Sequence, residues 1–473
     1  MNESVPQSLM QEVGAVIRDR LGLDFPPGRS RELETALNVV AGAFACADAE
    51  QCARRIVTRS LDADELKTLA QALTVGETNF FRDPEVFQAL ERDILPPLIE
   101  QRRGADRRLR IWSAGCCTGE EAYTIAIILR RLLPDYEDWN LTLLATDLNP
   151  HFLARAGAGV YGKWSFRRAT PWALRRHVAA TAGGKYEVDE SIRDMVAFDY
   201  LNLAEGRYPS VFNNTNAMDI VFCRNVLIYF DPSTVERVIE HLRSCLLPGG
   251  WLALGRSERV PDVVERLRPV VVRGDVWYRR DDSATAQAAV PAAAGAAPPV
   301  VRVARATPFP ASLQRRFDDG DYAAVAAAVT DYLHGPPPCS TDRRRAMRML
   351  AQAHANLGEL DAAQTWCEEA ISEDKLDPRL HYLMASVLLE RNRAAEAEEC
   401  LRRALVADDR FVLAHFALGN LTRRHRESDD ARGHFERTLS LLRHFRSDEI
   451  IPDSEGLTAG RLSEIAEHAL LQC

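Results

Sequence analysis

Hydrophobic residues follow three different rhythms along this 473-residue chain. Over the first hundred residues they recur three and four positions apart, for example in 36–44 and 66–73, and this spacing is typical of amphipathic helices. Pro84 suits the first turn of one more helix, because the N–H that proline lacks would have no partner there. We therefore predict an all-α N-terminal domain over about residues 1–100.

From residue 101 to 281, short apolar runs alternate with helical patterns. This alternation is typical of an α/β doubly wound fold, in which a mostly parallel sheet binds its ligands at the carboxyl ends of the strands. The first three apolar runs are each followed by a helical stretch. Buried strands are predicted at 109–114, 141–146, 219–223, 251–254 and 276–279.

One stretch, at about 158–198, interrupts this rhythm. Gly183 and Gly184 divide it, and residues 185–188 alternate between polar and apolar like an exposed strand. We predict a small antiparallel β insertion within the doubly wound domain.

The third rhythm is a repeat. Residues 282–310 are dominated by Ala, Pro and Val and predict a semi-stiff linker. Over 311–445 small and large apolar residues then recur 34 positions apart, which is the period of the tetratricopeptide repeat (TPR). We expect a right-handed helical array whose concave face binds an unidentified protein or peptide, then a helical tail over 446–473. The recurring sets are Ala351, Ala385 and Gly419; Ala363, Ala397 and Ala431; Cys367, Leu401 and Phe435; and Ala370, Ala404 and Thr438.

Composition narrows the classes of function. The formal charge of -9 disfavours nucleic-acid binding, which usually needs a basic surface. The ten cysteines are scattered without a CxxC pair, so we expect reduced thiols and no metal site. The first ten residues carry no secretory signal and no run of 18 apolar residues occurs. We therefore expect a cytoplasmic protein without membrane insertion.

The turns after two of the predicted strands carry the candidate chemistry. Residues 115–121 are rich in small residues but contain neither GxGxxG nor a Walker lysine, which disfavours a pyrophosphate cofactor. Glu120 and Glu121 open a helix, where they are either ordinary N-terminal charge or partners for an ammonium group. Asp147 ends the next strand and either caps a helix or reaches ribose hydroxyls. A nucleoside with an amino-acid tail and no phosphate, S-adenosylmethionine, fits this combination.

With these motifs the chain resembles the CheR family of methyltransferases, which esterify glutamate side chains of methyl-accepting chemotaxis receptors. The similarity covers about residues 10–280, and the repeats resemble those of CheR variants in chemosensory-like pathways. It implies a Rossmann-like class I methyltransferase fold, S-adenosylmethionine as cofactor and S-adenosylhomocysteine as product. The matching blocks are Leu73-Thr74-x-x-x-Thr78-x-Phe80-Phe81-Arg82, the run from Trp112 to Glu121, Thr146-Asp147, the run from Phe222 to Phe230, and Gly255-x-Ser257-Glu258.

The resemblance also implies roles for single residues. Thr78 and Arg82 would hold the carboxylate end of the cofactor or face the reacting centre, and Tyr229 would lie near the transferred methyl group. We take Arg82 and Tyr229 as the candidate catalytic residues, although without the family they could be a surface charge and a core tyrosine. The implied cofactor contacts are Glu121 to the ammonium group, Asp147 to the ribose, Asn202 and Leu203 to the adenine, and Arg224 and Asn225 closing the site.

The chain departs from the family pattern in three places. Gly76 stands where an asparagine is usual, and Cys117 where serine is common. Arg29 and Arg31 are followed by an acidic and apolar stretch rather than by an arginine-rich docking helix. Neither Cys116 nor Cys117 is expected to act as a nucleophile, because no paired histidine follows. The alternatives are a catalytically degenerate scaffold that binds the cofactor through a dead domain, and, further off, a nucleic-acid methyltransferase.

Overall fold

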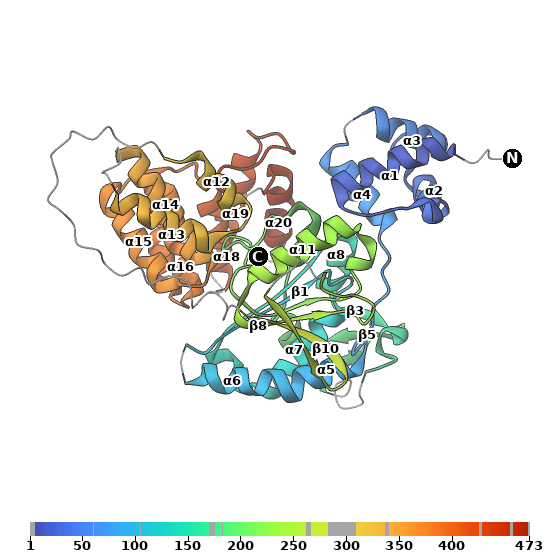
Figure 1. The fold of residues 1–473 in the computed structure, drawn as a ribbon, viewed down its shortest axis with the longest axis horizontal. Coiled ribbons are helices and arrows are strands. Elements are labelled where there is room, and N and C mark those ends of the chain that lie inside the picture. The colour runs from blue at the N-terminus through green and yellow to red at the C-terminus, as the bar shows by residue number, and fades with distance from the viewer. Residues whose placement is uncertain are drawn as a thin grey trace, which may run out of the picture. The chain divides into compact units, whose positions relative to one another are not determined.

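The chain forms two compact units, which the computed structural model in Figure 1 shows as ribbons. The first unit comprises Met1–Gly206 and Met218–Arg280, and the second comprises Arg207–Ala217 and Asp281–Cys473. The structure describes residues 5–59, 61–104, 106–169, 176–181, 183–261, 266–281, 309–335, 340–424, 428–454 and 457–471.

The first unit begins with helices, as the sequence predicted. They are α1 (Gln7–Leu21), α2 (Ser30–Val40), α3 (Ala49–Thr58) and α4 (Ala63–Leu73), with a short 3₁₀ turn η1 (Pro27–Arg29). Helix α4 starts at a capping box, in which Asp62 and Glu65 each accept a hydrogen bond from the other's backbone N–H. Apolar side chains from all four helices share one core, so this part of the chain folds around its own hydrophobic cluster.

A second helical stretch leads into the sheet. It consists of α5 (Pro84–Ala89), the π turn η2 (Leu90–Ile94) and α6 (Leu95–Arg103). Pro84 occupies the first turn of α5, as expected for a residue without an N–H. In Figure 1 the strands of the sheet lie between α6 and α11 (Pro232–Cys245).

The sheet has seven strands in the order β6-β2-β1-β7-β8-β10-β9. Strands β6, β2, β1, β7 and β8 run parallel, and β10 and β9 are antiparallel additions at one edge. The chain moves outward from β1 to β6, then returns to pair β7 with the other side of β1, which makes β1 and β7 the topological switch point. The strands are β1 (Arg108–Ala114), β2 (Asn140–Asp147), β6 (Ala197–Tyr200), β7 (Met218–Cys223), β8 (Leu246–Leu254), β9 (Leu267–Val272) and β10 (Asp275–Arg280).

The doubly wound architecture is therefore confirmed, with two strands that the sequence did not predict. Strands β6 and β9 lie at the two edges of the sheet, and most of their residues are partly or fully exposed. An edge strand is covered less than a central one, so its sequence lacks a continuous apolar run. Helices α7 (Glu120–Leu132) and α8 (Pro150–Ala158) follow β1 and β2. Shorter turns are η3 (Tyr136–Asp138), η4 (Lys163–Phe166), α10 (Glu190–Arg193), η5 (Leu203–Glu205) and η6 (Leu227–Tyr229).

The interrupted stretch after α8 forms a separate antiparallel sheet in the order β3-β5-β4. Its strands are β3 (Val160–Gly162), β4 (Val178–Ala180) and β5 (Lys185–Val188). Strand β5, expected as an exposed strand, is the central one, and its last side chain, Val188, is buried in the core of the unit.

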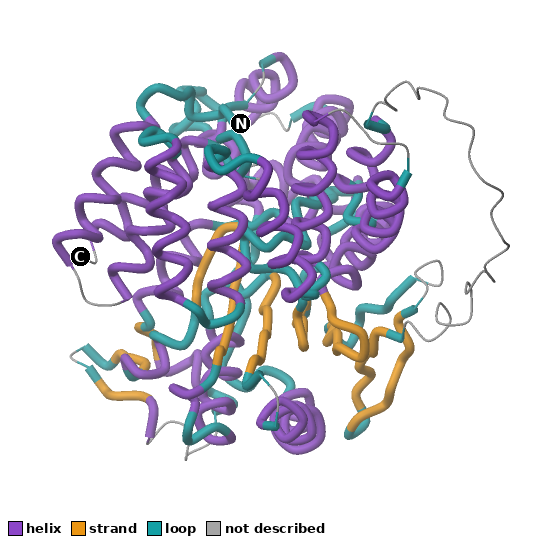
Figure 2. Tube along the Cα trace, turned by 90° about the vertical axis from the view of Figure 1, so that its left-hand side faces the viewer, coloured by secondary structure: helices purple, strands orange, loops and turns teal. Residues whose placement is uncertain are grey.

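The second unit is a stack of helices (Figures 1 and 2). All the residues that recur at the 34-residue spacing and have a side chain larger than hydrogen are buried, and Gly419 leaves no room for a Cβ beside the ring of Phe435. Most of the predicted linker, 282–308, lies outside the described residues. Among the helices that are described, none is long and apolar enough to cross a bilayer. The helices are α12 (Ala311–Asp318), α13 (Tyr322–His334), α14 (Ser340–Asn356), α15 (Leu360–Glu373), α16 (Pro378–Glu390), α17 (Ala394–Ala407), α18 (Val412–Arg424), α19 (Ser428–Leu442) and α20 (Ala459–Leu471).

Candidate functional site

A pocket in the first unit lies at the carboxyl ends of β1, β2 and β7, where a doubly wound sheet binds its ligands. Its wall comes from segments that are far apart in sequence: the chain after α4, the turns after β1 and β7, the end of β2, and the chain after β6. Every site residue expected from the sequence lines it. These residues are Thr78, Arg82, Glu121, Asp147, Asn202, Leu203, Arg224, Asn225 and Tyr229.

The turn after β1 depends on glycine. Gly115 has a φ of +80°, and a Cβ there would lie 2.3 Å from Cγ2 of Val226 in the turn after β7. The backbone N–H groups of Gly115 and Cys116 donate to the Thr146 carbonyl at 2.8 and 2.9 Å. The N–H of Cys117 donates to Oδ2 of Asp147 at 2.8 Å. The turn thus packs tightly against its neighbour, and its N–H groups already have partners on β2.

Asp147 is not the cap of the helix that follows it. Asn149 caps α8 by accepting from the N–H groups of His151 and Phe152, while Asp147 accepts from the N–H of Asn149 at 2.8 Å. The Asp147 carboxyl is only 9% exposed, and this burial raises its pKa to about 6. The capping alternative is therefore excluded, and a buried carboxylate faces the pocket.

The two adjacent glutamates of α7 have different surroundings. Glu120 is 1% exposed, and its carboxylate accepts from the hydroxyls of Thr118 at 2.6 Å and Ser165 at 3.1 Å, which ties α7 to η4. Glu121 lines the pocket and accepts from the Ser113 hydroxyl at 2.9 Å. Only the second carboxylate is therefore available to a ligand.

The turn after β7 is held by a carboxylate whose role the sequence did not reveal. Glu258, 4% exposed, accepts hydrogen bonds at 2.6–2.9 Å from the backbone N–H groups of Asn225, Val226, Leu227 and Gly255. Its motif was part of the resemblance, but only the folded chain brings it under this turn. It fixes Asn225, whose φ of +59° is uncommon outside glycine.

Arg224 links the pocket's carboxylates. Its side chain is 2% exposed, and Nη1 donates to Oε2 of Glu121 at 2.9 Å. Nη2 contacts the carboxylate of Asp83 and donates to the Arg82 carbonyl at 3.3 Å. The guanidinium therefore ties the turn after β7 both to α7 and to the chain that precedes α5.

Arg82 lies in a sharply turned segment. Phe80 and Phe81 are buried, and Phe81 and Asp83 on either side of Arg82 both have positive φ, 56° and 57°. Such backbone conformations cost about 1–3 kcal/mol each in non-glycine residues and occur often at functional sites. The guanidinium donates to the Glu77 carbonyl at 2.6 Å and faces the pocket, so Arg82 is more than a surface charge beyond an aromatic pair.

The N-terminal region also lines the pocket, through Leu23 after α1 and Leu73 at the end of α4. The N–H of Asp24 donates to the Tyr229 carbonyl at 2.7 Å, and the guanidinium of Arg29 lies 5.8 Å from the centre of the Tyr229 ring. Tyr229 is half-buried and its pKa is raised by burial. Asn202, which is buried, caps η5 and contacts the Arg20 carbonyl at 3.4 Å. Tyr229 thus lines the pocket and also packs against the core of the N-terminal helices.

Two of the three departures from the family pattern, Gly76 and Cys117, lie in close packing. A side chain at Gly76 would meet the Phe152 ring at 2.8 Å, so this aromatic ring fills the space that an asparagine would take. Burial raises the pKa of the Cys117 thiol to about 12 and that of Cys116 well above its ordinary value. Both thiols stay protonated at neutral pH, in keeping with the expectation that neither is a nucleophile.

The chemistry of the pocket fits S-adenosylmethionine. Backbone N–H groups at strand ends bind phosphates in dinucleotide sites, but here Thr146, Asp147 and Glu258 accept those of both turns. Glu121 already binds one cation, Arg224, and so is suited to an ammonium group. The buried Asp147 has acceptor capacity left for hydroxyls.

Comparisons with known proteins agree with this site. Residues 76–273 match the model of the CheR methyltransferase SAM-binding domain, and residues 345–375 match a tetratricopeptide repeat. A probable chemotaxis protein methyltransferase of Rhizobium etli is 34% identical over 43% of this chain and 75% of its own length. Chemotaxis protein methyltransferase 1 of Pseudomonas aeruginosa is 34% identical over 45% and 76%.

A longer match is the probable biofilm formation methyltransferase WspC of Pseudomonas aeruginosa, 29% identical over 85% of this chain and 92% of its own. The fold, the pocket and these relatives agree on an S-adenosylmethionine-dependent enzyme with attached TPR repeats. The chain belongs to the CheR methyltransferase family.

Proposed function

We propose that this enzyme transfers a methyl group from S-adenosylmethionine to glutamate carboxylates of a methyl-accepting chemotaxis receptor. The observation that carries the proposal is that all nine expected site residues line one pocket at the switch point of the sheet. They are Thr78, Arg82, Glu121, Asp147, Asn202, Leu203, Arg224, Asn225 and Tyr229. The names of the relatives, chemotaxis and biofilm-formation methyltransferases, support a receptor substrate in a chemosensory pathway.

The amino-acid end of the cofactor would be held by a charged residue, and its adenine by buried residues. Glu121 binds the ammonium group, with Ser113 fixing its carboxylate. Asp147 accepts the ribose hydroxyls, and the buried pair Asn202 and Leu203 contacts the adenine. Thr78, which is half-buried, lines the pocket and would contact the amino-acid end or the reacting centre.

The bound cofactor supplies a methyl group on a positively charged sulfur. A glutamate carboxylate is ionised near neutral pH, so no residue of this chain needs to remove a proton. One carboxylate oxygen forms a bond to the methyl carbon as the sulfur–carbon bond breaks, giving a methyl ester and S-adenosylhomocysteine. The chain contributes by aligning the carboxylate and excluding water.

Of the two arginines, Arg82 is better placed to orient the substrate carboxylate. The guanidinium of Arg224 is buried and already binds Glu121, Asp83 and the Arg82 carbonyl. Arg82 makes one hydrogen bond to a backbone carbonyl, and the rest of its guanidinium can form charge-assisted bonds to a carboxylate. We assign Arg224 the task of closing the site, and Tyr229 that of facing the methyl group.

We also propose a division of labour along the chain. Residues 1–100 would form the helical domain that helps to receive the substrate, and 101–281 the catalytic domain, with the β insertion near 158–198. Beyond the linker at 282–310, the repeats of 311–445 and the tail of 446–473 would bind another protein or peptide, because TPR arrays act through such contacts.

The test is transfer of labelled methyl groups from S-adenosylmethionine to membranes that contain the receptors of the source cell. A base-labile label should appear on a receptor band. It should fall by about a hundredfold in Arg82→Ala, the cost of losing a charge-assisted hydrogen bond in the transition state. Arg92→Ala, an exposed arginine outside the pocket, is the matched control. Measurable S-adenosylhomocysteine binding without any labelled receptor would favour the scaffold alternative.

A further inference from the structure

Eleven residues of the chain belong to the repeat unit although they lie within the sequence of the catalytic unit. This segment, Arg207–Ala217, joins η5 to β7, yet its contacts assign it to the second unit. Six of its residues are no more than 4% exposed: Tyr208, Ser210, Val211, Thr215, Asn216 and Ala217. A surface connection would be more exposed than this, so the segment is bound rather than merely passing over the repeats.

The segment folds into a braced turn. The Ser210 N–H donates to Oγ1 of Thr215 at 3.0 Å, and the Thr215 N–H returns a hydrogen bond to the Ser210 carbonyl at 3.1 Å. The Phe212 N–H donates to Oγ of Ser210 at 3.1 Å. These local bonds occupy the turn's polar groups and leave Val211 and Phe212 projecting as an apolar pair.

Polar groups of the repeats bind the backbone and side chains of the segment. Oδ1 of Asn356, at the end of α14, accepts from the Val211 N–H at 2.7 Å. The Ala355 carbonyl accepts from Nδ2 of Asn216 at 3.1 Å, and the Tyr322 hydroxyl donates to the Pro209 carbonyl at 2.7 Å. Two of these three contacts reach the segment's backbone and the third its Asn216 side chain, so together they fix the path of the segment.

The apolar pair completes the contact. Val211 is buried in the same cluster as residues of α14 and α16. The Phe212 ring stacks on Tyr382 of α16, with centroids 5.2 Å apart and planes 20° from parallel, and Tyr382 in turn meets Phe411 edge-on at 5.6 Å. Aromatic pairs of this kind anchor many protein interfaces. Helices α14 and α16 therefore form the binding site for this turn.

We propose that the repeat array binds segment 207–217 of its own chain and thereby sets the shape of the cofactor pocket. The residues flanking the segment are the ones that would contact the cofactor: Asn202 and Leu203 come just before it, and β7 carries the chain from its end to Arg224 and Asn225. Holding the segment restrains both. The inference rests on the proposed function only in taking this pocket as the cofactor site.

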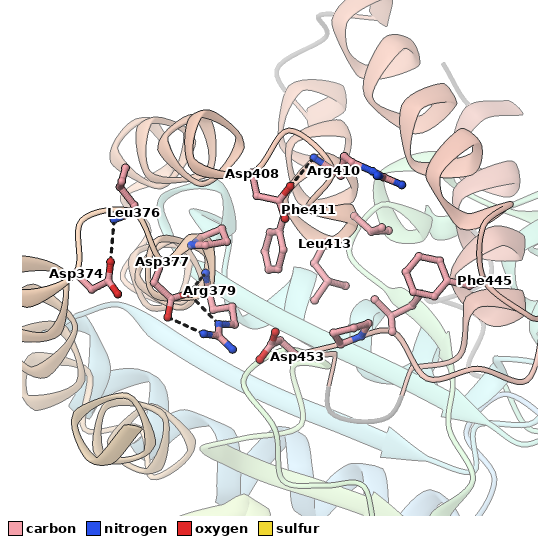
Figure 3. Close-up of a pocket in the computed structure, with 14 residues that line it drawn as sticks. Asp374, Leu376, Asp377, Arg379, Asp408, Arg410, Phe411, Leu413, Phe445 and Asp453 are labelled. Carbon is pink, nitrogen blue, oxygen red and sulfur yellow. Dashed lines mark hydrogen bonds and ion pairs between the residues drawn. The ribbon is translucent and has the colours of Figure 1, made fainter. Parts of the chain in front are cut away.

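The array has a recess at the turns between its repeats, and Figure 3 shows Asp374, Asp408, Phe445 and other residues around it. Phe445 packs against the same apolar cluster as Val211 but makes none of the hydrogen bonds or ring contacts with the segment named above, so Phe445→Ala controls for the loss of an aromatic side chain from that cluster.

The experiment compares Tyr382→Ala, Phe212→Ala and Phe445→Ala in the full chain, by hydrogen exchange of peptides covering 207–217 and by calorimetric titration with S-adenosylhomocysteine. In the first two variants we expect exchange in the segment to speed up at least tenfold and the affinity for S-adenosylhomocysteine to fall three- to tenfold. The double variant should lose no more than the larger single loss, because both changes remove the same contact. Phe445→Ala should behave like the wild type.

Phe212→Ala keeps the test valid if Tyr382→Ala disturbs the array, since Phe212 is not part of any repeat helix. Unchanged exchange in the segment would overturn the proposal, and so would faster exchange with unchanged affinity. A wild-type chain that fails to bind S-adenosylhomocysteine would instead refute the proposed function, while the exchange data would still decide whether the repeats bind the segment.

Discussion

The turns after β1 and β7 differ in which acceptors bind their backbone N–H groups. Each bends sharply through residues with positive φ at the end of a buried parallel strand, and each has backbone N–H groups that could bind a phosphate. In the first turn those groups donate to the Thr146 carbonyl and the Asp147 carboxylate. In the second they donate to the carboxylate of Glu258.

The carboxylates of Glu258 and Asp147 differ in whether they can also bind a ligand in the pocket. Glu258 accepts four backbone N–H bonds and has no place in the pocket lining, so it acts only on the shape of the turn. Asp147 accepts two and lines the pocket. In both turns the protein's own acceptors, the Thr146 carbonyl and the carboxylates of Asp147 and Glu258, already bind the backbone N–H groups that bind phosphate in dinucleotide sites, and this disfavours a ligand that needs those groups.

Glu258→Ala should have the largest effect on stability. It leaves four buried N–H groups without their acceptor, so we expect the free energy of unfolding to fall by about 3–4 kcal/mol. Denaturant titration of the full chain measures it. Glu240→Ala removes an exposed glutamate that pairs with Arg243 on the same helix and should change stability by less than about 0.5 kcal/mol. Equal losses in the two variants would refute the structural role of Glu258.

Asp147→Asn should weaken cofactor binding more than it weakens the fold. Hydrogen bonds to a charged acceptor contribute about 1.5–3 kcal/mol, so the affinity for S-adenosylhomocysteine should fall about ten- to a hundredfold. Asn retains one acceptor oxygen for the turn after β1, which limits the loss of stability. Calorimetric titration is the measurement, and wild-type affinity in this variant would remove Asp147 from the binding site.

Gly115→Ala tests the contact between the two turns. The added methyl would lie 2.3 Å from Val226 at a φ of +80°, so the turns must separate. We expect a loss of about 1–3 kcal/mol in unfolding free energy together with weaker binding of S-adenosylhomocysteine. Gly28→Ala, where the methyl meets no atom within 4 Å, is the matched control. If both variants melt at the wild-type temperature, the turns are not packed as described.

The pH dependence of binding should show the smallest effect. Burial raises the pKa of Asp147 to about 6, so its carboxyl gains a proton as the pH falls below that value and loses its charge for the ribose. The affinity for S-adenosylhomocysteine should be level above pH 7 and about tenfold weaker at pH 5. Asp147→Asn should abolish this dependence, and a wild-type curve that stays level to pH 5 would contradict it.

The sequence predicted those features that depend on local pattern or on a family motif. The buried strands 109–114 and 219–223 and the 34-residue repeat were correct because burial on both faces and helix pairing leave periodic signals. The residues that line the pocket came mainly from the resemblance to CheR proteins. Nothing local distinguishes Glu120 from Glu121, since their partners lie on different elements.

The features that were missed depend on contacts between distant residues. Glu258 accepts from N–H groups more than thirty residues away, and Asn356 binds a segment 145 positions earlier in the chain. The signal in the segment itself was weak: one apolar pair, Val211-Phe212, in an otherwise polar stretch. Asn149 rather than Asp147 caps α8, a choice between neighbours that only the path of the backbone decides.

The most direct test of the cofactor site is whether Glu121 recognises the cofactor's ammonium group. Wild type and Glu121→Gln would each be titrated with S-adenosylhomocysteine and with its analogue that lacks the α-amino group. We predict that the wild type prefers S-adenosylhomocysteine by at least about tenfold, and that Glu121→Gln loses this preference, because the two changes remove the same ion pair. An undiminished preference in Glu121→Gln would contradict the claim that this pocket selects its ligand through its own carboxylates.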